Sequence, residues 1–230
     1  MKSLIDHFKE VPGAISVTEA VALHQVIKNN IIPYFEYGVD LGAHAGKSSC
    51  IATNALSGIC SHFYMVDPLY DMDNPAVWWD TQGTSPKNYY FGRGNYNETV
   101  IANVKKFSHD IEISLEGIPS MEFLSKCPML GYVFVDTDNH NENLASREAD
   151  LIKPKLTKGG LLVFHDYMNQ FSGISYVFDR LNDGKNFEQI KVDWEEIYKM
   201  VDELGGEEGN DSWHIYEGIK PNFIGFLRRI

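Results

Sequence analysis

Short apolar runs alternate with segments of helical periodicity along most of the chain. Strand-like runs occur at 35–41, 63–66, 111–115, 132–135, 161–164, 187–192 and 222–227. The periodicity predicts helices at 47–56, 98–107, 174–181 and 194–204, and one before the fifth strand that uses Leu144, Leu151, Ile152 and Leu156. This alternation predicts a doubly wound, mostly parallel, seven-stranded α/β sheet whose last strand runs antiparallel beside the sixth.

A helix start is visible close to the N-terminus. Residues 16–19 read S-V-T-E, which is the pattern of a capping box. Ala20, Leu23 and Ile27 follow at helical spacing. We therefore expect a helix that begins directly after Ser16 and buries this apolar face.

The stretch 69–96 has little periodicity and is too long for an ordinary strand-to-helix connection. It is rich in aromatic residues, among them Trp78, Trp79 and Phe91. We interpret it as an insertion or a functional loop. Its role stays open between a cover whose rings stack on a substrate, a small satellite core, and an interface to a second subunit.

Composition narrows the class of protein. A chain of 230 residues with 43% hydrophobic residues suits one domain that spans 1–230. The formal net charge of -12 argues against a generic nucleic-acid binder and against adsorption to anionic membranes. Cys50, Cys60 and Cys127 form no disulfide framework, and no targeting segment or membrane span is visible. We expect a cytoplasmic protein with neither nucleic acid nor membrane as a partner, and leave a homo-oligomer open.

The most informative motif is a glycine-containing loop between the first strand and the next helix. Residues 39–49 read V-D-L-G-A-H-A-G-K-S-S. A phosphate-binding P-loop needs one more residue between its glycines, and a dinucleotide fingerprint needs glycine where His44 stands. The spacing acid-x-Gly-x-x-x-Gly instead suits S-adenosylmethionine (SAM), because an acid can meet the positive ammonium of that ligand. The candidate cofactor residues here are Asp40, Gly42, Ala43, Gly46 and Ser48. His44 and Lys47 are expected to point to solvent or to the sheet edge, without a catalytic role.

A second acid, Asp67, ends the second strand 27 residues after Asp40. An acid at this place in an open α/β sheet can accept hydrogen bonds from both hydroxyls of a ribose. The simpler alternative is that Asp67 and Pro68 only cap a turn. The matching glycine loop favours ribose binding.

Polar clusters also follow the fourth and fifth strands. Residues 135–140 read V-D-T-D-N-H, and residues 164–167 read F-H-D-Y. Neighbouring parallel strands end at the same edge of the sheet, so these clusters are expected to converge near the cofactor. Asp138, His140 and His165 are the candidates for proton transfer. Alternatively, Asp138 and His140 cap the next helix and His165 is a core histidine.

Taken in order, these motifs resemble the class I SAM-dependent methyltransferases. The resemblance rests on V-D-L-G-A-H-A-G-K-S-S, M-V-D-P, S-L-E-G-I-P-S, F-V-D-T-D-N-H and L-x-K-G-G-L-L-V-F-H-D-Y, and it covers roughly residues 13–182. The branch that it is most similar to contains the macrocin-type and catechol-type O-methyltransferases. Their Rossmann-like fold agrees with the sheet expected from the pattern.

The resemblance implies a role for each cofactor residue. The loop 40–48 would hold the methionine part of SAM, and Asp67 would hold the ribose. Gly117 and Ile118 would lie beside the adenine, and Asp136 would also lie against the cofactor.

The resemblance also implies a metal site. Asp136, His165 and Asp166 match positions that hold Mg²⁺ in metal-dependent relatives, where the ion clamps two substrate oxygens and prepares a hydroxyl for attack on the SAM methyl group. Those relatives carry Asp-Asp or Asp-Asn where this chain has His165 and Asp166, and Asn139 is an extra residue in the D-x-D-H pattern. Mg²⁺ or another divalent cation is therefore a candidate cofactor beside SAM.

The function expected from these features is methyl transfer to a hydroxyl of a small molecule or sugar. Two alternatives stay open on the same scaffold. One is a tailoring enzyme that is not a methyltransferase, and the other is a binding module without catalytic activity.

Overall fold

The computed structural model describes residues 1–13, 15–30, 34–70, 96–108, 110–137, 142–167, 172–206 and 224–230. Two of the predicted catalytic residues, Asp138 and His140, lie outside the described residues, as does most of the aromatic stretch predicted at 69–96.

A seven-stranded sheet forms the centre of the protein. Its strands are β1 (Phe35–Leu41), β2 (Cys60–Val66), β3 (Glu112–Glu116), β4 (Leu130–Val135), β5 (Leu156–Phe164), β6 (Phe187–Gln189) and β7 (Gly225–Arg229), in the spatial order β3-β2-β1-β4-β5-β7-β6. The first five strands are parallel, and β7 runs antiparallel between β5 and β6. The predicted fold class is confirmed.

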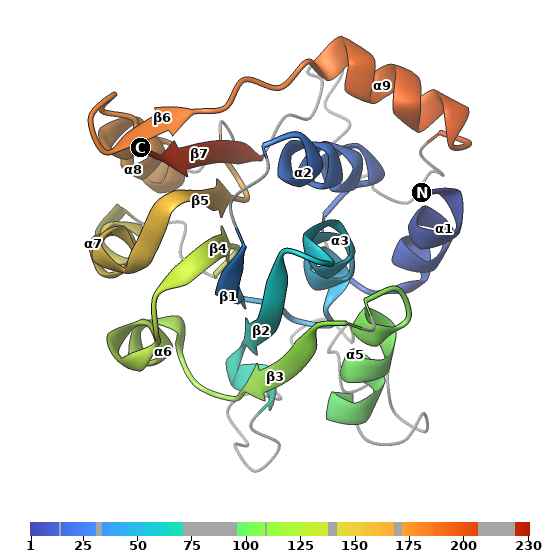
Figure 1. The fold of residues 1–230 in the computed structure, drawn as a ribbon, viewed down its shortest axis with the longest axis horizontal. Helices are drawn as coiled ribbons and strands as arrows, with labels where there is room; N and C mark the ends of the chain where they lie inside the picture. Colours follow the sequence, from blue (N-terminus) through green and yellow to red (C-terminus); the bar gives the residue numbers. More distant parts are fainter. Residues whose placement is uncertain are drawn as a thin grey trace.

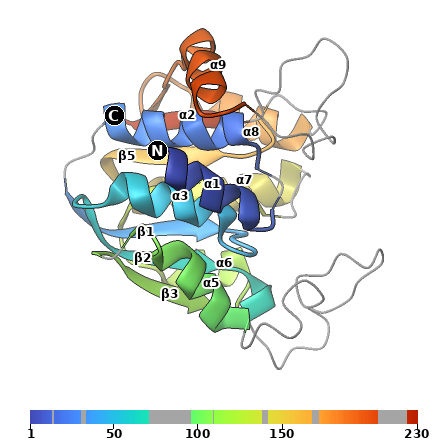
Figure 2. The same cartoon turned by 90° about the vertical axis from the view of Figure 1, so that its right-hand side faces the viewer.

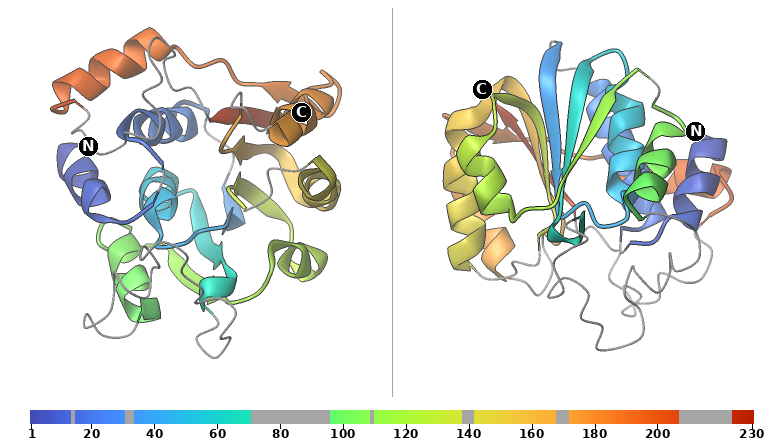
Figure 3. Two further views of the ribbon diagram at one scale, coloured as in Figure 1. Left: turned by 180° about the vertical axis from the view of Figure 1, so that it is seen from behind. Right: turned by 90° about the horizontal axis from the view of Figure 1, so that it is seen from below.

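Helices cover both faces of this sheet (Figure 1). One layer contains α6 (Ser120–Lys126), α7 (Glu142–Lys155) and α8 (Ser172–Leu181). The other contains α1 (Lys2–Glu10), α2 (Val17–Asn29), α3 (Lys47–Leu56) and α5 (Tyr96–Lys105), with α9 (Trp194–Glu203) packed on α2 (Figure 2). The view from below shows the strands as a twisted layer between these two sets of helices (Figure 3). In the described part of the chain, no helix is long and apolar enough to cross a membrane.

Several elements differ from the sequence expectation. Helix α1 was not predicted, although its short apolar set of Leu4, Ile5 and Phe8 is buried. Helix α6 was not predicted either, because its seven residues are too few to show a clear helical period. Strand β5 begins at Leu156, which was expected in the preceding helix, because Leu156 pairs with Leu130 of β4 before a shift in register.

The capping box of α2 is confirmed. The Ser16 side chain accepts from the backbone N–H of Glu19, and the Glu19 carboxylate accepts from the backbone N–H of Ser16. Ala20, Leu23 and Ile27 are buried as predicted. Since α2 packs between α3 and α9, Glu19 is also fully buried, with 0% exposure.

Strand register places the candidate site. Leu41 pairs with both Val66 and Val135, and Val135 pairs with Phe164, so β1, β2, β4 and β5 end at one level. Gly42 follows β1 at φ +82°, and a Cβ atom there would lie 2.0 Å from the carbonyl oxygen of Asp136. Only glycine allows the ends of β1 and β4 to approach this closely.

We predict that Gly42→Ala destabilises the protein more than Gly58→Ala. Both glycines have a left-handed backbone, with φ +82° and +77°, but no atom of the described residues lies within 4 Å of a Cβ added at Gly58. Gly58→Ala should therefore lower the free energy of unfolding by about 1 kcal/mol from backbone strain alone. Gly42→Ala should lower it by about 2 kcal/mol more, because the backbone of Asp136 must also move. Urea unfolding of both variants measures the difference, and equal losses would contradict the close approach.

Candidate active site

A cavity of about 750 Å³ opens at the carboxyl ends of the strands. Each of four parallel strands is followed directly by a residue that lines it: Gly42 after β1, Asp67 after β2, Asp136 after β4 and His165 after β5. Parallel α/β sheets bind their ligands at this edge. The predicted convergence of the strand-end motifs is therefore observed.

The glycine loop forms one wall of the cavity. Gly42, Ala43 and Ser48 line it, whereas Asp40 and Gly46 do not. Gly46 instead begins α3 with a left-handed backbone, φ +83°, and a Cβ there would crowd Val104 at 2.9 Å. Its role in this structure is to let α3 pack closely against its neighbours.

Asp40 lies beneath the loop and is fully buried. Its Oδ2 accepts hydrogen bonds from the Ser48 hydroxyl at 2.6 Å and the Ser49 hydroxyl at 2.5 Å, while its Oδ1 has no partner in the described parts of the chain. Burial raises the pKa of Asp40 to about 7, although the two hydroxyls oppose the shift. The carboxylate thus reaches the cavity through Ser48, which lines it, rather than by lining it directly.

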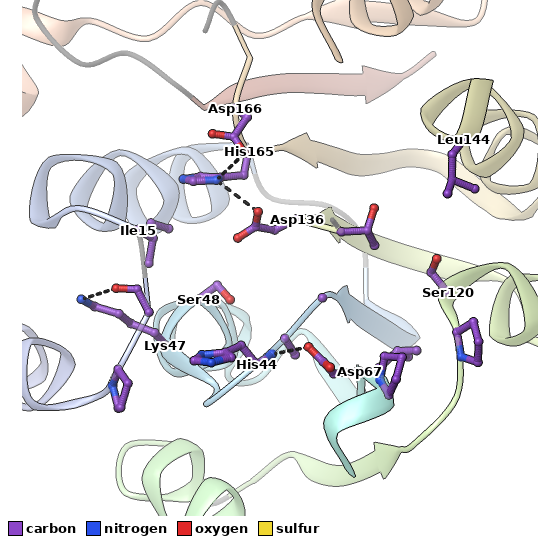
Figure 4. Close-up of a pocket in the computed structure, with 18 of the residues that line it drawn as sticks. Ile15, His44, Lys47, Ser48, Asp67, Ser120, Asp136, Leu144, His165 and Asp166 are labelled. Carbon is purple, nitrogen blue, oxygen red and sulfur yellow. Dashed lines mark hydrogen bonds and ion pairs between the residues drawn. The ribbon is translucent and has the colours of Figure 1, made fainter. Parts of the chain in front are cut away.

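Asp67 joins the loop to the end of β2. Its Oδ2 accepts from the backbone N–H of His44 at 2.9 Å, and its Oδ1 accepts from that of Leu69 at 2.9 Å (Figure 4). Burial raises the pKa of Asp67. These contacts agree with the turn-capping alternative. Because Asp67 also lines the cavity and each carboxylate oxygen can accept a second hydrogen bond, ribose binding remains compatible with them.

The structure places the two residues expected beside the adenine just outside the lining of the cavity. Gly117 and Ile118 do not line the cavity, while the next residues, 119–121, do. Ser120 at the start of α6 and Thr137 after β4 both line the cavity, and both donate a hydrogen bond to Glu148 of α7. Glu148 is only 1% exposed. This buried carboxylate fixes the start of α6 relative to the end of β4.

The predicted metal residues lie together. Nδ1 of His165 is 3.2 Å from Oδ1 of Asp136 and 3.4 Å from Oδ2 of Asp166, and the three donor atoms lie within 4.8 Å of one another (Figure 4). Asp166 has a left-handed backbone with φ 60°, an uncommon conformation for a residue other than glycine. Such backbone strain often accompanies functional sites, and here it turns Asp166 into the cavity.

A fourth charged group, Glu19, meets His165 from the far side. Its Oε1 lies 3.6 Å from Nε2 of His165. Burial opposes a charge on the imidazole, but Asp136, Asp166 and Glu19 outweigh it and hold the pKa of His165 well above its ordinary value. Sequence reasoning used Glu19 only as a helix cap, because nothing in the local pattern connects it with the end of the fifth strand.

His44 and Lys47 correct an expectation. Both line the cavity instead of pointing to solvent or to the sheet edge. Lys47 is only 9% exposed, donates to the carbonyl of Gly13 at 3.2 Å, and places its ammonium 4.6 Å from the ring of Phe8. Lys47 is covered because α1, which was not predicted, packs against α3.

The strand-end groups therefore line a cavity at the edge where α/β sheets bind their ligands. A family model described as a methyltransferase domain matches residues 39–167, which is more than half of the chain. The chain belongs to this family of methyltransferase domains. No curated protein matches it in sequence.

Solved structures share the fold at low sequence identity. A protein from Klebsiella pneumoniae, provisionally described as an O-methyltransferase, is 9% identical with a TM-score of 0.53, over 99% of this chain and 88% of its own. A methyltransferase from Geobacter sulfurreducens is 12% identical with a TM-score of 0.53, over 94% and 80%. A protein from Streptococcus mutans, provisionally described as a methyltransferase and solved in complex with SAH, is 8% identical with a TM-score of 0.51, over 90% and 95%. These likenesses show the fold, and the family model identifies the chain as a methyltransferase domain.

We predict that Asp40→Asn stabilises the metal-free and cofactor-free protein at neutral pH. The folded pKa of Asp40, about 7, exceeds the unfolded value of about 4, so the folded state binds the proton more tightly. The wild type should therefore lose stability relative to the variant as the pH rises from about 4 to about 7, with no further change above that. The full difference should reach roughly 2 to 4 kcal/mol. Urea unfolding at several pH values measures it, and a difference that does not vary with pH would contradict the assignment.

We also predict that Glu148→Ala weakens cofactor binding. The alanine side chain accepts from neither of the two hydroxyls of Ser120 and Thr137, so one wall of the cavity loses its fixed geometry. The affinity for S-adenosylhomocysteine (SAH) should fall by about threefold to tenfold, measured by calorimetry. Glu142→Ala, an exposed change on the same helix, is the control and should leave the affinity unchanged.

Proposed function

We propose that this protein transfers the methyl group of SAM to a hydroxyl of a small molecule or sugar, assisted by a divalent cation. The observation that carries the proposal is the cluster of Asp136, His165 and Asp166 on the wall of the cavity. The glycine loop and Asp67 border the same cavity. A methyl donor and an acceptor hydroxyl can therefore be bound side by side.

The cluster fits a divalent cation. Adjacent ligands of a small ion, each about 2.1 Å from it, lie about 3 Å apart. The distances of 3.2 and 3.4 Å from Nδ1 of His165 to the two carboxylate oxygens are close to this spacing. Nδ1 is buried, and no described residue gives it a hydrogen bond. An imidazole with two carboxylates suits Mn²⁺ and similar ions as well as Mg²⁺.

Each part of the site has a distinct task in this proposal. The backbone of residues 42–43 and the Ser48 hydroxyl hold the amino-acid part of SAM, with the negative charge of Asp40 beneath them. Asp67 binds the ribose hydroxyls, and its own contacts to the loop keep it in place. A bound cation would hold the acceptor oxygens and lower the pKa of the hydroxyl. The reaction then depends on holding that oxygen in line with the methyl group.

Calorimetric titration with SAM and SAH tests the cofactor. We expect binding in the micromolar range, about -8 kcal/mol. Asp67→Ala should weaken SAH binding by about 10- to 100-fold, because it removes a charged acceptor of hydrogen bonds from the cavity. Asp150→Ala removes an exposed carboxylate on α7 and should change nothing. Absence of SAH binding by folded wild-type protein would favour a binding module without this activity.

The acceptor is tested by product formation. The protein is incubated with SAM and hydroxylated acceptors, including catechols and sugars, with and without Mg²⁺ or Mn²⁺, and SAH release is measured. Release that requires both a hydroxyl and a cation supports the proposal. SAM binding with transfer to amines but not to hydroxyls would contradict O-methylation.

A further inference from the structure

Glu19 joins the start of α2 to the candidate metal cluster. It is fully buried and lies outside the segment that matches the methyltransferase family. Its two carboxylate oxygens have different surroundings. Oε2 accepts from both the backbone N–H and the hydroxyl of Ser16, each at 2.9 Å. Oε1 has no hydrogen-bond partner among the described residues and lies 3.6 Å from Nε2 of His165.

The His165 ring lies between this carboxylate and the cavity. Nε2 faces Glu19, and Nδ1 faces Asp136 and Asp166. His165 is 4% exposed, and neither ring nitrogen has a hydrogen-bond partner within the described part of the chain. A small movement would bring Nε2 within hydrogen-bond distance of Oε1.

The direction of that hydrogen bond determines which ring nitrogen of His165 carries the hydrogen. An ionised carboxylate can only accept a hydrogen bond, so Nε2 must carry its hydrogen when it faces Oε1. In the neutral imidazole, the lone pair then stands on Nδ1, on the side of Asp136 and Asp166. A cation at Nδ1 would replace only the proton on that nitrogen and leave the Nε2–H on Glu19.

We propose that Glu19 is a positioning residue that keeps the hydrogen of His165 on Nε2 and thereby directs the Nδ1 lone pair to a divalent cation shared with Asp136 and Asp166. This inference rests on the cation site of the proposed function. Histidines that bind metals commonly donate their other ring N–H to a carboxylate, and loss of that partner typically weakens metal binding 10- to 100-fold. Here the same carboxylate also caps α2, so the helix start and the site share one group.

Glu19→Gln tests the proposal with little change in size. The amide oxygen can replace Oε2 in the contacts with Ser16, which turns the amide NH₂ toward Nε2. Because NH₂ donates, Nε2 must then offer its lone pair, and the hydrogen moves to Nδ1. We expect the Kd for Mn²⁺, measured on the full chain from the electron paramagnetic resonance signal of the free ion, to rise 10- to 100-fold.

Two further measurements accompany the titration. Nitrogen-15 NMR of the metal-free protein should show a protonated Nε2 of His165 in the wild type and an unprotonated Nε2 in Glu19→Gln. Ser16→Ala is the matched control, because it removes a hydroxyl contact with Oε2 but leaves Oε1 facing His165. This control should lower the thermal unfolding midpoint and keep the Mn²⁺ affinity within about twofold of the wild type, since it weakens only the cap.

The outcomes are separable from those of the methyltransferase assignment. Unchanged Mn²⁺ affinity in Glu19→Gln, or no Mn²⁺ binding by the wild type, overturns the inference, whereas SAH binding by the same samples tests the cofactor independently. A large loss of Mn²⁺ affinity in Ser16→Ala would also overturn it, because the effect would then come from the helix start. If Glu19→Gln does not fold, an unprotonated Nε2 in the wild type is sufficient to reject the inference.

Discussion

The arrangement of charges around the His165 imidazole constrains much of the site. Three carboxylates from three elements, Glu19 of α2, Asp136 after β4 and Asp166 after β5, surround one buried ring. Burial takes water away from these acids, and without a positive charge among them they would also repel one another. The imidazole can supply that charge, because the surrounding acids hold its pKa well above the ordinary value, and a divalent cation would supply more of it. The helix start, two strand ends and the cavity wall are therefore coupled through a single side chain.

The other side of the cavity depends on close backbone approach instead of charge. Gly42 brings the end of β1 against the carbonyl of Asp136, and Gly46 brings α3 against its neighbours. Asp40 holds the loop from below through the Ser48 hydroxyl. Asp67 holds it from the end of β2 through the backbone N–H of His44. The ionised form of Asp40 destabilises the fold at this position, since burial raises its pKa to about 7. A carboxylate retained under these conditions is consistent with a cationic ligand above it.

Local sequence patterns predicted the parallel part of the sheet well. The runs at 35–41 and 132–135 lie within strands, and the residues that follow four parallel strands line one cavity, because parallel strands in register must present their ends at one edge. Short or shared elements were harder. Seven residues of α6 show no clear period, and Leu156 was assigned to a helix because its pairing with Leu130 is a contact between distant segments.

The amino-acid sequence by itself determined which chemical groups stand at the strand ends, and hence the class of cofactor that we propose, because strand and loop motifs consist of adjacent residues. Only the tertiary structure decided which of those groups reach the cavity. Asp40 is buried beneath the loop, Lys47 is turned inward by α1, and Glu19 of α2 lies against His165 at the end of β5. These outcomes depend on how helices pack over the sheet, and that packing joins residues that are far apart in the chain and carry no shared local pattern.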